Sequence, residues 1–500
     1  MAEPKPNILL ITTDQQHADH LGIAGLLAVP TPNLDRLGRE GVHLRRAYTT
    51  CPLCTPARVS LLTGRYPSMH GAYTIGVTQP HLPQPTLPSC LANAGYRTAL
   101  FGKAHFVARM DEMAHIAGSP DPSPGFFETF TGPYLGFDEV RVSTGHTINA
   151  IPDGHYRVFL EQAGVSYADW FPQMGPDYNH DHVGVWNIPV DYHDSTWVGK
   201  ETTDFIHRQA GAESPWFAWA SFQDPHEPHV CPKEWMDRVD PARMDIPEGY
   251  REGEFADRPA FYEEAYYQGN LGSIDDEWGA PCASRRAVLE TEASDALQAT
   301  LGMVAGIDDQ IGRILAALES SGQLENTLII FTSDHGEYHG HHGFWGKGLP
   351  AYEDAQRVPL LIWGPGLGIL PQTTNSLASL IDLPATILDF ATVDFPAGMQ
   401  GVSLAKLLRQ EAYAVRDAVL VELRPVADFS QHTLVAGRYK LVVYESLSQG
   451  ELYDLQRDPN QYTNLWNHPD HQDLRTDFLL KLSQFYQRNE GRLLPRSSFA

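Results

Sequence analysis

Four apolar segments of similar design recur along the chain, and each ends abruptly in polar residues. They span residues 7–13, 97–101, 216–220 and 327–331. Continuous apolar runs of this length are typical of strands that helices cover on both faces. The pattern predicts an α/β fold with a large mixed, mainly parallel sheet sandwiched by helices. In such sheets ligands bind beyond the carboxyl ends of the strands.

Helical spacing is clearest over residues 297–320, where apolar side chains recur every three or four positions and Gly322 follows as a stop signal. Two other stretches, 106–200 and 230–285, are rich in proline, glycine and aromatic residues and show weak periodicity. We interpret these two stretches as long ordered loops.

The pattern of apolar and polar residues changes after about residue 412. Short alternating strands are predicted at 418–423, 432–436 and 439–444, followed by a helix near 470–488. We therefore expect a catalytic domain over 1–412 and a smaller C-terminal α+β subdomain over 413–500, containing an antiparallel sheet.

Net charge, hydropathy and cysteine content argue against several classes of protein: nucleic-acid-binding, membrane-spanning and disulfide-rich proteins. The chain has 36 basic and 62 acidic residues, a formal charge of -26, which argues against nucleic acid as a partner. No run is long enough to cross a bilayer, and no signal peptide is visible at the N-terminus, so we expect no membrane partner and a cytoplasmic location. Five scattered cysteines do not resemble a disulfide framework.

Cys54 is a candidate reactive residue. It stands just before Pro56 and an apolar stretch that reads as a helix, with Arg58 in the first turn. Helix amides and a guanidinium favour an anion at such a place. Two other interpretations remain open: a buried structural cysteine, and a redox pair with Cys51.

Acidic residues follow the first and fourth apolar segments. Asp14 with Gln15, and Asp334 with His335, offer oxygen ligands and one imidazole for a divalent metal. Each aspartate alone would more often be a helix cap. Three histidines of a glycine-rich loop are weaker candidates for zinc, and we expect them to face solvent or to support other residues: His339, His341 and His342.

Four further polar residues stand near segment ends. Lys103 and His105 lie two apart and point to one side if the strand continues. His226 lies between two prolines, which suits a fixed proton donor as well as a structural turn. Lys347 lies in a glycine-rich loop, where a solvated lysine would be unremarkable.

Taken together, these residues resemble the type I sulfatases of the alkaline-phosphatase superfamily, over nearly the whole chain and in the same order. The cysteine motif and its downstream Leu-Leu-Thr-Gly are the most specific part. The matching segments are 54–58, 61–65, 102–105, 225–229, 333–337, 346–347 with 352–353, 357–360, 451–455, 458–459 and 464–465.

The resemblance implies that Cys54 is oxidised to formylglycine, with a formylglycine-generating enzyme as a partner during maturation. It implies that a divalent metal, Ca²⁺ first, is held by four residues and by the converted Cys54: Asp14, Gln15, Asp334 and His335. Arg58 and Lys103 would hold the hydrated aldehyde, and His105 would be the base. His226 and Lys347 would contact the sulfate and act as acids on a small anionic sulfate ester, aryl or alkyl.

One departure from the family pattern concerns the metal. The usual paired aspartates are Asp14-Gln15 here, a pattern shared with phosphonate monoester hydrolases and some bacterial sulfatases, which makes Mn²⁺ an alternative ion. Hydrolysis of phosphonate monoesters or phosphodiesters is the alternative activity, although Lys103 and His105 are the sulfatase pair. A non-enzymatic binding scaffold of the same fold is a third hypothesis. Separately from these, the two loop stretches are candidates for the interface of a homo-oligomer.

Overall fold

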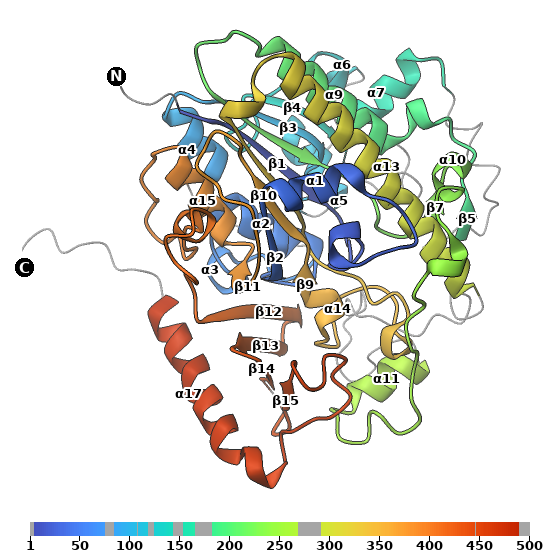
Figure 1. The fold of residues 1–500 in the computed structure, drawn as a ribbon, viewed down its shortest axis with the longest axis vertical. Helices are drawn as coiled ribbons and strands as arrows, with labels where there is room; N and C mark the ends of the chain where they lie inside the picture. The colour runs from blue at the N-terminus through green and yellow to red at the C-terminus, as the bar shows by residue number, and fades with distance from the viewer. Residues whose placement is uncertain are drawn as a thin grey trace, which may run out of the picture.

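The described part of the chain forms an α/β domain joined to a smaller antiparallel sheet. The structure is a computed structural model, and it describes residues 5–75, 85–107, 109–118, 125–143, 154–165, 183–268, 292–445 and 447–489. Figure 1 shows the large sheet at the centre and the smaller sheet below it. The predicted fold class is confirmed.

The large sheet has the strand order β11-β2-β10-β8-β1-β6-β3-β4, with β9 paired to β2. The strands pair in parallel except where β10 and β9 run antiparallel to their neighbours. The four apolar segments form consecutive inner strands: β8 (Thr327–Ser333), β1 (Asn7–Thr13), β6 (Trp216–Ser221) and β3 (Arg97–Lys103). The other strands are β2 (Val42–Tyr48), β4 (Glu139–Ser143), β9 (Arg357–Val358), β10 (Leu360–Trp363) and β11 (Gln372–Ser379).

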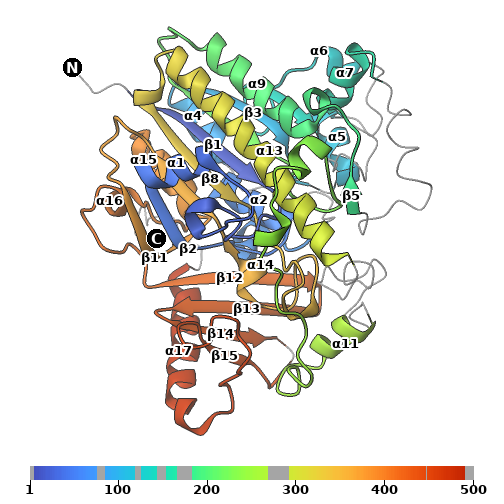
Figure 2. The same cartoon turned by 45° about the vertical axis from the view of Figure 1, so that its right-hand side comes forward.

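Helices cover both faces of this sheet, as the continuous apolar runs predict. In β1, Ile8 and Leu10 pack into one core and Leu9 and Ile11 into the other, because successive side chains of a strand point to opposite faces. The first core includes α2 (Cys54–Thr63), α4 (Leu87–Asn93), α15 (Asp382–Phe390) and α16 (Ala405–Leu408). The second includes α1 (Pro32–Glu40), α9 (Asp194–Arg208) and α13 (Ala293–Ser320), which cross the sheet in Figures 1 and 2.

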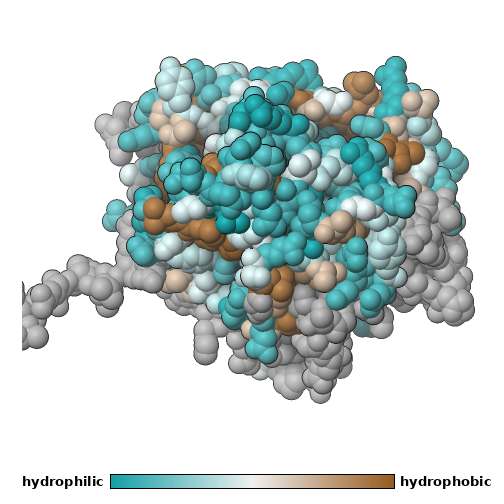
Figure 3. Space-filling view, turned by 90° about the horizontal axis from the view of Figure 1, so that it is seen from below, coloured by the Kyte–Doolittle hydropathy of each residue, from teal (hydrophilic) through white to brown (hydrophobic). Residues whose placement is uncertain are grey.

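The smaller sheet begins at Ala418. Its strands β12 (Ala418–Val426), β13 (Phe429–Ala436), β14 (Tyr439–Tyr444) and β15 (Glu451–Asp454) are antiparallel neighbours. The helix α17 (Gln472–Asn489) packs on one face through Phe478 and Leu482. Val419 and Val421 on the other face pack against Tyr48 and Leu377 of the large sheet. Seen from this end, the described surface is mainly hydrophilic (Figure 3).

The two stretches expected to be loops contain helices and short strands, so that expectation is wrong for those segments, whereas residues 244–260 contain neither helix nor strand. The helices are α5 (Arg109–Ala117), α6 (Phe126–Thr129), α7 (Gly154–Gln162), α10 (Lys233–Met236), α11 (Phe261–Gln268) and most of the first two turns of α9. The first turn of α9 buries Asp194, Ser195 and Thr196, so its apolar periodicity starts only at Trp197. The remaining parts of both stretches, with Trp170, lie outside the described residues.

Short elements complete the described chain. They are α3 (Pro67–His70), α14 (Glu353–Gln356), and the paired strands β5 (Val183–Val185) and β7 (His229–Cys231). In the part of the chain that the structure describes, we find no helix with the length and apolar character needed to cross a membrane.

Candidate active site

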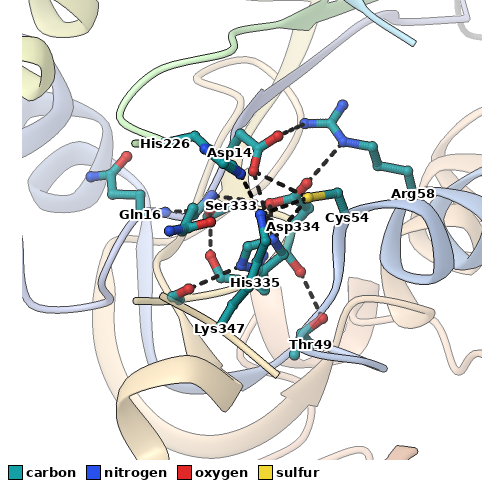
Figure 4. A network of polar contacts seen from close by, with 12 residues as sticks. Asp14, Gln16, Thr49, Cys54, Arg58, His226, Ser333, Asp334, His335 and Lys347 are labelled. Atoms are coloured by element: carbon teal, nitrogen blue, oxygen red, sulfur yellow. Dashed lines mark hydrogen bonds and ion pairs between the residues drawn. The ribbon is translucent and has the colours of Figure 1, made fainter. Parts of the chain in front are cut away.

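The polar residues that follow the central strands meet at one place (Figure 4). The strands β8, β1, β6 and β3 are consecutive in the sheet, and Thr13 of β1 pairs with Ser333 of β8 at their carboxyl ends. Parallel strands end at the same edge of a sheet, so side chains that lie hundreds of positions apart in sequence become neighbours. Contacts link Asp14, Cys54, Arg58, Lys103, His226, Asp334, His335 and Lys347.

Cys54 is the first residue of the fully buried helix α2. Its Sγ lies 3.2 Å from His335 Nε2, 3.2 Å from Lys347 Nζ and 3.6 Å from Asp14 Oδ1. Burial and Asp14 raise the pKa of Cys54, but Lys347, Lys103 and His335 outweigh them and lower it below its usual value. A structural cysteine packs among apolar groups, whereas this thiol faces charged ones.

Arg58 lies one turn into α2 and is fully buried. Its Nε donates to Asp334 Oδ2 over 2.8 Å and its Nη2 to Asp14 Oδ2 over 3.4 Å. Its Nη1 donates to Ser221 Oγ over 2.7 Å and to the carbonyl oxygen of Lys103 over 3.1 Å. One planar guanidinium therefore connects the ends of β1, β3, β6 and β8, which fixes their side chains relative to Cys54.

Lys103 and Asp14 form a buried ion pair. Burial raises the pKa of Asp14, but Lys103, His226, Arg58 and Lys347 outweigh burial and hold it well below its usual range. The carboxylate is thus ionised and surrounded by cations, as a metal ligand must be before the metal binds.

Four buried residues could hold a metal ion: Asp14, Cys54, Asp334 and His335. One ligand atom from each lies within 4.8 Å of the others. The Nδ1 of His335 lies 2.9 Å from the carbonyl oxygen of Gly336 and donates to it, so Nε2 is the nitrogen that faces Cys54. Burial lowers the pKa of His335, but Asp334 and Cys54 raise it to about 9, which shows that this place attracts positive charge.

The side chain of Gln15 completes this set. Its Nε2 contacts the carboxylates of Glu227 and Glu337. Its Oε1 is buried and has no hydrogen-bond partner among the described residues. A buried carbonyl oxygen without a partner is unusual, and a cation would satisfy it. The donor set therefore fits a divalent metal.

His226 and Lys347 form a contacting pair beside Cys54. The Nδ1 of His226 donates to the carbonyl oxygen of Glu227 over 2.7 Å, so Nε2 is the nitrogen that contacts Lys347 Nζ. Burial and then Lys347 lower the pKa of His226, while Cys54, Glu227 and Asp14 raise the pKa of Lys347 against the effect of burial. Lys347 Nζ contacts Cys54 Sγ over 3.2 Å, and His226 is linked to Cys54 through Lys347.

His105 differs from the expected arrangement. The extended backbone ends with β3 at Lys103, and His105 has a positive φ of 54°, so the two side chains do not share one face of a strand. Neither ring nitrogen of His105 has a hydrogen-bond partner among the described residues. Burial, Lys103 and Arg58 lower the pKa of His105 well below its usual value, which keeps the ring neutral.

The three loop histidines do not behave alike. His339 and His342 are only 3% and 2% exposed, so of the two expected roles, facing solvent or supporting other residues, these two do not face solvent. The ring of His342 stacks on Tyr352 with centroids 3.8 Å apart. Its Nδ1 lies 3.0 Å from Glu254 Oε1. The side chain of His341 is 30% exposed and lies near Asp354.

Sequence reasoning did not single out three residues that support the site: Ser221, Glu227 and Glu337. Ser221 Oγ accepts a hydrogen bond from Arg58. The backbone carbonyl of Glu227 accepts from His226, and the carboxylate of Glu227 contacts the amide nitrogen of Gln15. Glu337 Oε1 accepts from the amide of Gly346 over 2.5 Å, next to Lys347. Ser221 ends β6, while Glu227 and Glu337 follow β6 and β8 by six and four residues inside the family-matching segments 225–229 and 333–337.

Fold and site together define the class of protein. The sulfatase family model matches residues 6–393, and the chain belongs to this family, the type I sulfatases of the alkaline-phosphatase superfamily. It is a sulfatase enzyme. A second family model, described as the C-terminal part of N-sulphoglucosamine sulphohydrolase, matches residues 340–488.

Individual relatives are similar over almost their whole length. An arylsulfatase of Clostridium perfringens (strain 13 / Type A) is 31% identical over 497 residues, which cover 97% of this chain and 96% of the relative. The solved structure of a phosphonate monoester hydrolase from Silicibacter pomeroyi has a TM-score of 0.80 at 25% identity, covering 99% and 98% of the two chains. That of Agrobacterium radiobacter has a TM-score of 0.78 at 26% identity, covering 98% and 97%.

Proposed function

We propose that this sulfatase hydrolyses a small aryl or alkyl sulfate monoester at Cys54, after conversion of Cys54 to formylglycine. The observation that carries this proposal is the position of Cys54 Sγ, 3.2 Å from both Lys347 Nζ and His335 Nε2 at the start of a buried helix. The similarity to an arylsulfatase and the sequence motif at 54–58 also support it.

Conversion of Cys54 requires a formylglycine-generating enzyme and places an aldehyde where the thiol now lies. In the hydrated aldehyde one hydroxyl attacks sulfur and releases the alcohol, and deprotonation of the other then expels sulfate and restores the aldehyde. Arg58 contacts Asp334 and Lys103 contacts Asp14 next to this position, where both would hold the reacting group and neutralise its charge.

A divalent cation at this place would be held by Asp14, Gln15, Asp334 and His335. Ca²⁺ suits the three oxygen ligands, while the neutral amide and the imidazole make Mn²⁺ the alternative. The ion would supply a Lewis acid that polarises a sulfate oxygen. Gln15 contributes no charge, so the chain offers two carboxylates to this ion rather than three.

Proton transfers fall to three residues of the chain. His105 is held neutral, so it can accept the proton that triggers loss of sulfate. His226 and Lys347 contact one another, and Lys347 contacts Cys54. This pair is placed to deliver a proton to the departing alcohol oxygen, since the Glu227 carbonyl fixes the orientation of the His226 ring.

Intact-mass measurement and turnover of an aryl sulfate test this proposal together. Active protein should carry formylglycine at position 54, and Cys54→Ala should lose at least about a thousandfold in kcat/KM, because the nucleophile is missing. Cys231→Ala removes another buried thiol and should keep its activity. A fully active protein with an unmodified Cys54 would refute the proposal, as would a Cys54→Ala variant with unchanged function, the outcome expected of a binding scaffold.

Hydrolysis of phosphonate monoesters is a second candidate function. Gln15 in place of a second aspartate and the similarity to two phosphonate monoester hydrolases favour it. Both substrates would use the same residues. Comparing kcat/KM for an aryl sulfate and an aryl phosphonate on the same mass-verified protein separates them, and we expect the sulfate to be preferred because Lys103 and His105 follow the sulfatase pattern.

A further inference from the structure

A second group of metal-ligating side chains lies outside the candidate active site. It consists of His17, His341 and Asp354, whose ligand atoms all lie within 4.8 Å of one another. His17 Nε2 and His341 Nδ1 are each 3.3 Å from Asp354 Oδ1. We propose that these three residues bind a zinc-like divalent cation, independently of the candidate metal site at Asp14.

The N···O distances match an ion held between the atoms, and the His17–Asp354 pair also lies within hydrogen-bonding distance. Both N···O separations are 3.3 Å, longer than the roughly 2.9 Å of a usual N–H···O bond. An ion about 2.1 Å from each atom would span such a pair at roughly 104°, close to a tetrahedral angle. The two imidazole rings are nearly parallel, with an interplanar angle of 10° and centroids 5.8 Å apart, so both present an edge to the same carboxylate.

The donor types select the class of cation. Two imidazoles and one carboxylate suit zinc and its neighbours in the first transition row, while calcium prefers oxygen ligands alone. The side chains of His17 and Asp354 are 9% and 13% exposed, and that of His341 is 30% exposed. The group is therefore shielded on the protein side and open to water near His341, where a fourth ligand would come from solvent.

Protonation states of the group are compatible with binding. Burial lowers the pKa of His341 despite the nearby Asp354, so the ring is neutral. Burial raises the pKa of Asp354, but His341 and His17 outweigh it and lower that pKa, so the carboxylate is ionised. Binding through His17 Nε2 moves its proton to Nδ1, so the 3.2 Å contact that Nδ1 accepts from the Asp19 amide is lost.

Two further histidines lie close by. The His20 ring is 5.0 Å from that of His17 and 4.9 Å from that of His339. Among the described residues, neither His20 Nδ1 nor either ring nitrogen of His339 has a hydrogen-bond partner. These two histidines lie next to the proposed site without belonging to its ligand group.

The proposed ion would connect three segments that frame the candidate active site. His17 lies two residues after Gln15, His341 lies in the loop that leads to Lys347, and Asp354 belongs to α14. A cation shared by these segments would hold the exit of β1 and the Lys347 loop together. Its effect would be to position these segments rather than to act on substrate.

Zinc binding to the full chain tests the proposal. The parent protein carries Cys54→Ala, because the Cys54 thiolate would itself attract zinc, and saturating Ca²⁺ is present to occupy the oxygen-rich site. Calorimetry on this metal-stripped protein should show one zinc per chain with micromolar or tighter affinity. Adding His341→Ala should weaken binding at least about 100-fold, since one of three protein ligands is lost. His207→Ala, which removes an exposed histidine of α9, should leave binding unchanged.

Two outcomes would overturn the proposal. One is a parent protein that binds no zinc, and the other is a His341→Ala protein that binds zinc as tightly as the parent. Asp354→Asn provides a second variant should His341→Ala fail to fold, and it should show the same loss. Because zinc binding is measured without turnover, failure of this proposal and failure of the sulfatase assignment remain distinguishable.

Discussion

The side-chain amide nitrogen of Gln15 contacts the carboxylate of Glu337, although 322 positions separate the two residues. The same nitrogen contacts Glu227. With its nitrogen held between two carboxylates, the amide must turn its oxygen the other way. This orientation explains why Gln15 can present a carbonyl oxygen where relatives of the usual pattern present a second aspartate, which would repel both glutamates.

Replacing Glu337 should weaken metal binding without touching a proposed ligand. In Glu337→Gln the amide of Gln15 loses its fixed orientation, and we expect a 10- to 100-fold loss in affinity for Ca²⁺ or Mn²⁺, roughly the effect of removing a residue that orients a ligand. Calorimetric titration measures it. Glu252→Gln, on an exposed position, is the matched control. Equal affinities in both variants would show that Glu337 does not orient Gln15.

Arg58 should not tolerate lysine. Its guanidinium donates to Asp334, Ser221, Asp14 and the Lys103 carbonyl in one plane, and an ammonium cannot reproduce that fork. We expect kcat for an aryl sulfate to fall about a hundredfold or more, roughly 3 kcal/mol of transition-state stabilisation. Steady-state kinetics and a thermal melt check this. Arg457→Lys, whose side chain is 77% exposed, should match the wild type.

The role of His226 predicts a dependence on the leaving group. If His226 and Lys347 protonate the departing oxygen, His226→Ala should slow alkyl sulfates far more than aryl sulfates with acidic phenols, because a good leaving group needs little help. A series of phenyl sulfates of increasing phenol pKa measures the slope of log kcat/KM. A variant whose slope equals that of the wild type would remove His226 from this step.

Stability should fall in mild acid because histidines are buried in neutral form. Burial lowers the pKa of His155 to about 4. Its Nδ1 accepts from the Val142 amide over 3.0 Å and its Nε2 donates to the Phe130 carbonyl over 2.7 Å. Since the unfolded chain takes up this proton near pH 6.5, the stability that His155 contributes is present above that pH and is lost as pH falls toward 4.

Unfolding in urea between pH 8 and pH 4 measures this effect. Below pH 6.5, His155 should account for a fall of up to about 1.4 kcal/mol per pH unit in the free energy of unfolding. His155→Gln cannot titrate, so its stability should approach that of the wild type as pH falls. Parallel pH profiles for the two proteins would show that His155 does not titrate on unfolding.

The sequence predicted the four long apolar strands better than the rest of the fold. Helices cover both faces of the strands β1, β3, β6 and β8, so these strands are continuously apolar. A continuous apolar run of this kind can be recognised as a buried strand from the sequence alone. The strand β2 was missed because Arg45 and Arg46 interrupt it where it is exposed, and β10 because it has only four residues. The helix α9 was missed because buried polar residues form its first turn.

Candidate site residues could be predicted from the sequence where they follow an apolar strand or belong to a family motif. The partners that orient them were not, since nothing in the sequence relates Glu337 to Gln15 or Ser221 to Arg58. The same holds for His17, whose neighbour across space is His341. Pairings of this kind depend on how separate loops fold over the sheet edge, which local periodicity does not encode.

The order of the central strands has a consequence for how activity is lost. Since β8, β1, β6 and β3 are consecutive and Arg58 connects their ends, no strand of this group can separate while the cluster stays assembled. Local opening at the periphery should leave turnover intact, whereas the amide hydrogens of β1 should exchange only when the whole sheet opens. Loss of activity in denaturant should therefore coincide with cooperative unfolding of the domain, so turnover itself serves as a probe of the folded population.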